Sequence, residues 1–128
     1  MKVSAQSLYN LILNEHDHLF MILDYLQDKP KIISTFESAF SRPRKDEETL
    51  MLSVKYDQSD YFEHRIEHRN ILNDIFSMDP DKFESSDEMK LFIKRIIDSH
   101  IDQFDSKLFK FCERQFETLL SRQATVTD

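Results

Sequence analysis

Histidines are the side chains of this sequence best suited to chemistry, and four of the five fall on apolar stripes with the spacing of a helix. His16 lies between Ile12 and Leu19, and His64 and His68 are four residues apart on one face of a later segment. Two imidazoles at this spacing can reach one metal ion. A buried imidazole without a partner costs about 1 to 3 kcal/mol, so several in one core favour a metal site over ordinary packing.

A further histidine and two carboxylates extend this set. His100 interrupts the stripe between Ile96 and Phe104, and Glu47 lies on the apolar stripe of another segment. Asp105 follows His100 by five residues, which on a regular α-helix rotates it by about 140° and favours an edge of the stripe. Imidazole together with carboxylate suits iron, manganese or zinc.

Two other residues that could take part in chemistry carry weaker signals. His18 is rotated by about 200° from His16 around a helix, so it is expected at the surface. Cys112 is the one cysteine; it cannot pair within the chain and is expected to be a buried, unreactive thiol. It lies about three turns beyond His100, too far to form a nucleophile pair, which makes a hydrolase a poor interpretation.

Four amphipathic segments position these residues: 4–27, 31–54, 59–77, and a long stretch that begins near residue 85 at a Ser-Ser-Asp-Glu capping signal. Pro43 lies inside the second segment and is expected to kink or split it. Helices of this length with short connections predict an all-α protein, an antiparallel up-and-down four-helix bundle. Its 128 residues suit one domain, residues 1–128.

Composition narrows the function classes. The chain contains no glycine, which argues against primed hairpin turns and phosphate-binding glycine loops. A formal net charge of -7 repels a phosphate backbone, so nucleic-acid binding is not expected. The sequence has neither a secretory signal at residues 1–18 nor an apolar run of the roughly 20 residues that a membrane span needs, so we expect a cytoplasmic protein without membrane association.

The order of these residues resembles the hemerythrin family, whose members hold a non-haem di-iron site inside a four-helix bundle. The family signature is a His, then His-x-x-x-Glu, then His-x-x-x-His, then His-x-x-x-x-Asp, one element per helix. The first, third and fourth elements match in EHDHLF, YFEHRIEH and SHIDQFD, and the Glu of the second matches in EETLM. The resemblance implies that iron is ligated by His16, Glu47, His64, His68, His100 and Asp105.

The second element of the signature is incomplete, because Pro43 stands where the family has its histidine. In the family, that histidine and the one matching His16 hold the iron that binds dioxygen, three histidines hold the other iron, and the residues matching Glu47 and Asp105 bridge the two. Three outcomes stay open. A second iron is held by His16, the bridges and either water or a substitute such as Asp46, Glu48 or a tyrosine; one metal fills the three-histidine position; or the site binds none. Two ions are favoured over one.

The resemblance implies binding of dioxygen, or of a related small molecule such as nitric oxide, for carriage, sensing or storage rather than turnover. Loss of a histidine would open the oxygen-binding iron further and shift the balance toward reduction of peroxide or oxygen. The competing class is a helical module without redox chemistry that docks on a partner. In that case the apolar residues of the long last segment extend the core or form a homodimer surface; they are Phe109, Phe116, Leu119 and Leu120.

Overall fold

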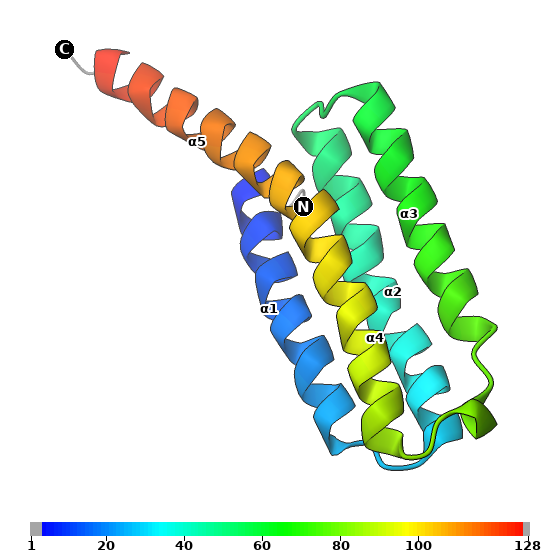
Figure 1. Ribbon diagram of the computed structural model, residues 1–128. Helices are drawn as coiled ribbons and strands as arrows, with labels where there is room; N and C mark the ends of the chain where they lie inside the picture. Colours follow the sequence, from blue (N-terminus) through cyan, green and yellow to red (C-terminus); the bar gives the residue numbers. More distant parts are fainter. Residues whose placement is uncertain (1–3, 127–128) are drawn as a thin grey trace.

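The computed structural model describes residues 4–126, with side chains described as far as Thr118. Four helical stems pack antiparallel, which confirms the predicted all-α four-helix fold, and residues 4–126 contain no strand (Figure 1). The fourth stem is continuous but changes its helical type in the middle, and its last turns extend beyond the bundle. In chain order the elements are α1 (Ala5–Tyr25), α2 (Lys29–Ser53), α3 (Gln58–Phe76), η1 (Pro80–Lys82), α4 (Ser86–His100), η2 (Ile101–Asp105) and α5 (Ser106–Val126).

Side-chain caps fix where three of the helices begin. Ser4 accepts a hydrogen bond from the backbone N–H of Ser7 at the start of α1, and Asp57 accepts one from Asp60 at the start of α3. The expected cap of the fourth stem is also present, since Ser85 accepts from the N–H of Glu88 at 3.1 Å. Each cap satisfies an N–H group that the first helical turn leaves without a partner.

Pro43 does not split the second helix, which was one of the two outcomes expected for it. It is buried inside α2, and the helix continues on both sides from Lys29 to Ser53. A proline inside a helix costs about 3 kcal/mol through its missing N–H and its ring. The apolar side chains before and after it, Phe40 and Leu50, are both buried in the same bundle, and their burial outweighs this local penalty.

The turn from α2 to α3 adopts a conformation that usually requires glycine. Lys55 has a φ of 55°, in the left-handed region. The N–H of Lys55 donates to the carbonyl of Leu52, and the N–H of Tyr56 donates to that of Met51. These two bonds form a Schellman motif that ends α2 and sets the start of α3.

Two apolar clusters fill the bundle, one toward each end. Buried residues of α1, α2 and the fourth stem belong to both, whereas α3 supplies buried residues to the first and only the partly buried Tyr61 to the second. The first cluster is Leu19, Leu23, Ile32, Phe36, Phe40, Ile71, Ile75, Met89, Ile93 and Ile97. The second cluster is Leu8, Ile12, Leu50, Met51, Val54, Leu108 and Cys112. In α1, His16 lies in sequence between a residue of each cluster, Ile12 and Leu19, and in α2 Glu47 lies between Phe40 and Leu50. The polar residues of interest therefore form a layer between two apolar blocks.

Within the described residues, none of the helices combines the length and the apolar character that a membrane span requires.

Candidate metal centre

The structure brings all six predicted site residues together in this middle layer. Five of them, contributed by α2, α3, α4 and η2, each offer a ligand atom within 4.8 Å of all the others: Glu47, His64, His68, His100 and Asp105. His16 of α1 adjoins this group, with its Nε2 3.0 Å from Oε2 of Glu47. The six side chains are buried, and Glu47 and Asp105 are 0% exposed. Donors from every stem of the bundle thus meet at one place.

The two oxygens of Glu47 face different histidines. Oε1 lies 3.1 Å from Nε2 of His64, 3.0 Å from that of His68 and 3.4 Å from that of His100. Oε2 lies 3.0 Å from Nε2 of His16. One carboxylate oxygen is therefore directed toward three imidazoles and the other toward one.

Asp105 divides its oxygens in the same way. Oδ1 lies 3.0 Å from Nε2 of both His64 and His100. Oδ2 lies 3.3 Å from Nε2 of His16. The cluster thus has a three-histidine side and a one-histidine side, and each carboxylate supplies an oxygen to both sides.

The inward position of Asp105 depends on a change of helix type. Residues Ile101–Asp105 form a π-helical turn, which ends with the N–H of Ser106 bonded to the carbonyl of Ile101, five residues earlier. Such a turn aligns residues five apart, whereas a regular α-helix aligns residues three and four apart. Asp105 therefore lies on the same face as His100, and the expectation that it borders the stripe is wrong.

The charges in the cluster stabilise one another. Burial alone raises the pKa of Glu47, but the hydrogen bonds from His100, His16 and His64 outweigh it and hold the pKa well below its usual range. Burial alone lowers the pKa of His100, but Asp105 and Glu47 raise it to about 10. These opposite shifts favour a carboxylate anion beside protonated imidazole when no metal is bound.

His68 titrates in the other direction. Burial lowers the pKa of its imidazole, and the neighbouring His64 and His100 lower it further, while only Glu47 raises it. A neutral imidazole is the form that ligates a metal ion. His68 is therefore available as a ligand with the smallest displacement of protons.

Several buried polar atoms in the cluster have no hydrogen-bond partner. They are both carboxylate oxygens of Asp105 and the Nδ1 atoms of His68 and His100. The Asp105 oxygens lie 3.0 Å to 3.3 Å from histidine nitrogens without hydrogen-bond alignment. Ligand atoms that surround a shared metal ion are expected to lie close together without forming aligned hydrogen bonds to one another. The residues present therefore fit a metal site.

The two carboxylates predicted as substitutes for the missing histidine lie beside other charged side chains. Glu48 forms ion pairs with Arg65 at 3.0 Å and with Arg44 at 3.6 Å. Asp46 lies close to Glu15 of α1, a residue that the sequence did not single out. Burial and this contact raise the pKa of Glu15 to about 8. Sequence position alone could have drawn attention to Glu15, because it directly precedes His16.

The remaining candidate residues are not members of the metal cluster. His18 is exposed, as expected. Cys112 is buried in the second apolar cluster, and burial raises the pKa of its thiol to about 11, as expected for an unreactive cysteine. Phe109 and Phe116 pack against that same cluster, while the side chains of Leu119 and Leu120 lie outside the described part of the chain.

Comparison with known proteins adds no assignment. No protein-family model, curated protein sequence or solved structure matches this chain. What the chain shows is a four-helix all-α protein with a buried cluster of histidines and carboxylates consistent with a metal site.

Proposed function

We propose that the protein holds two non-haem iron ions in this cluster, in the manner of the hemerythrin family, and binds dioxygen or a similar small molecule there. The division of the carboxylate oxygens carries the proposal. Glu47 and Asp105 each direct one oxygen to the three-histidine side and the other to His16. A site for one ion would not require both carboxylates to be shared in this way.

The two sides offer unequal numbers of donors. His64, His68 and His100 with one oxygen from each carboxylate give five donors on one side. His16 with the remaining two oxygens gives three on the other. Iron with imidazole and carboxylate ligands and open positions exchanges electrons with dioxygen. The sparse His16 side is where we place the small molecule.

Aromatic side chains restrict the access of water to this layer. Phe40 packs against His68 with ring centroids 5.8 Å apart, and Phe109 lies 6.1 Å from His16. Phe104 is stacked on His100 at 5.6 Å. These contacts orient the imidazoles and keep the surroundings apolar, and such a shell controls solvent access and redox potential. Because apolar walls keep water away from the bound small molecule, they favour its reversible release over its reduction.

The deciding experiment is metal content per chain after anaerobic loading with ferrous iron, with the visible spectrum recorded before air, after air and after removal of oxygen. We expect about two irons per chain and an absorption band that appears with oxygen and disappears without it. His18→Ala is the matched control, because it removes an exposed histidine that is only two residues from His16 in α1. One iron would contradict the di-iron proposal, and none would favour the partner-docking class. A band that forms once and does not reverse would indicate oxygen reduction instead.

A further inference from the structure

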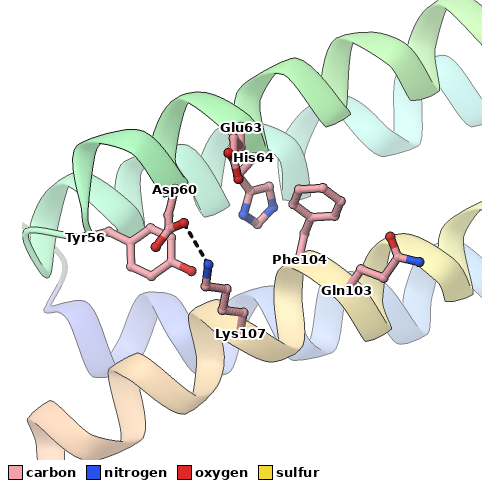
Figure 2. A pocket seen from close by; sticks show the side chains of 7 residues that line it. All are labelled: Tyr56, Asp60, Glu63, His64, Gln103, Phe104 and Lys107. Atoms are coloured by element: carbon pink, nitrogen blue, oxygen red, sulfur yellow. Dashed lines mark hydrogen bonds and ion pairs between the residues drawn. The ribbon is translucent and has the colours of Figure 1, made fainter.

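A surface pocket reaches one residue of the metal cluster. It is lined by Tyr56, Asp60, Glu63, His64, Gln103, Phe104 and Lys107 and has a volume of about 200 Å³. Figure 2 shows it between α3 on one side and η2 with the start of α5 on the other. We refer to it as the His64 pocket. His64 belongs both to this pocket and to the buried cluster.

The imidazole of His64 connects the two environments. Its Nε2 lies 3.1 Å from Oε1 of Glu47 and 3.0 Å from Oδ1 of Asp105. The ring also lines the pocket, beside the ring of Phe104 at a centroid distance of 5.6 Å (Figure 2). Phe104 is only partly buried, and its ring is also stacked on that of His100. A single layer of rings therefore separates the pocket from the carboxylates of the cluster.

The lining of the His64 pocket has an excess of negative charge. Lys107 is paired with Asp60 at 2.7 Å, which leaves Glu63 without an ion-pair partner among the described residues. Glu63 and His64 both line this pocket from α3 (Figure 2). Carboxylates at the mouth of a low-dielectric pocket attract cations and raise their local concentration.

The neighbouring pocket has the opposite balance. It shares Tyr56, Asp60 and Lys107 with the His64 pocket, but it adds Asp57 together with Lys110 and Arg114. The Asp60–Lys107 ion pair is shared by the two pockets. Apart from this pair, the His64 pocket has one more carboxylate than it has cations, and the neighbouring pocket has one more cation than it has carboxylates. A cation that approaches this face of the bundle is directed toward Glu63 and His64.

We propose that the His64 pocket is the entrance through which a divalent metal ion reaches the cluster. This inference rests on the proposed metal-binding function. Water occupies about 30 Å³ per molecule in the liquid, so the pocket has room for a cation that keeps part of its hydration shell. Glu63 holds the cation at the mouth, rotation of Phe104 opens the ring layer, and the ion loses water as the imidazole and carboxylate donors replace it.

The test uses Co²⁺ as the only metal ion. Its association rate is measured by stopped-flow absorbance, and its dissociation rate is measured by transfer of the ion to excess chelator. Glu63→Gln removes one charge and keeps the shape of the side chain. A carboxylate about 7 Å from a divalent cation at 0.1 M salt contributes about a threefold increase in association rate. We therefore expect Glu63→Gln to slow association about threefold, less so at high salt, with the number of ions per chain unchanged. Glu37→Gln is the matched control, an exposed residue of α2 with the same change of charge.

A second variant tests the ring layer. Phe104→Leu keeps an apolar side chain but removes the ring between pocket and cluster, so association and dissociation rates should both rise while their ratio changes much less. The entrance is refuted if cobalt binds normally and both variants show the rates of wild type and of Glu37→Gln. If the wild-type protein binds no cobalt at all, the proposed metal function itself is wrong, and the entrance falls with it.

Discussion

Glu47→Gln tests how much a buried charge of the cluster contributes to the stability of the bundle without metal. The carboxylate is 0% exposed and lies within 3.4 Å of four imidazole nitrogens. His100, whose pKa is raised to about 10 despite the lowering effect of burial, is protonated beside it at neutral pH. The substitution keeps the size of the side chain but leaves this buried cation with Asp105 alone.

The size of the effect follows from the distance between the charges. Two unit charges 3.4 Å apart attract each other by about 5 kcal/mol at an effective dielectric constant of about 20. Removing one partner of a buried pair typically destabilises a protein by about 3 to 5 kcal/mol. Because Asp105 still contacts His100, we expect the free energy of unfolding of the metal-free variant to fall by about 3 kcal/mol.

Urea unfolding of chelator-treated protein at pH 7 provides the measurement. Glu37→Gln serves again as the control, since substitutions on an exposed helix face change the free energy of unfolding by about 0.5 kcal/mol or less. A Glu47→Gln variant as stable as this control would refute the reasoning. It would show that the imidazoles are neutral in the metal-free state and need no counter-charge.

Three further predictions test the two sides of the cluster. His64→Ala should abolish metal retention, His16→Ala should leave one ion per chain and His18→Ala should leave both, as measured by metal analysis; equal retention in all three would contradict the assignment of ligands. Pro43→His should tighten binding of the second ion in a metal titration, whereas lower stability without a gain in metal would show that position 43 is not directed at the site. Stability of the metal-free protein should fall as the pH rises from about 6.5 toward 10, because the pKa of His100 is raised on folding from 6.5 to about 10, and a protonated group of this kind stabilises most fully below its unfolded pKa. Urea midpoints that rise over this interval would contradict it.

Regular helical spacing was enough to predict the fold and most of the candidate site. Apolar residues three and four apart define one face of each segment, and a residue that interrupts such a stripe must face the core. His16, His64, His68 and His100 all lie in regular α-helix or at its end, so their burial follows from position alone. Glu47 follows the same rule, four residues before the buried Met51.

The features that spacing could not predict depend on contacts between helices. The π-helical turn at Ile101–Asp105 changes the rotation between His100 and Asp105, and periodicity assumes a constant rotation per residue. Pro43 stays within a continuous helix because burial on both sides overrides a local preference. The contact between Glu15 and Asp46 joins α1 to α2, and no rule based on one helix can place it.

The charges of the cluster can balance one another without a metal ion. Two carboxylates face four imidazoles in a layer closed by apolar clusters on both sides. Protons on the imidazoles, retained most strongly by His100, balance the charge of Glu47 and Asp105 in the absence of an ion. Metal ions bind the deprotonated form of each ligand and therefore displace these protons. Metal and proton thus compete for the same charge balance, so we expect acid to weaken metal binding. By the proposed route, an ion that enters beside Glu63 would reach a site that is already assembled.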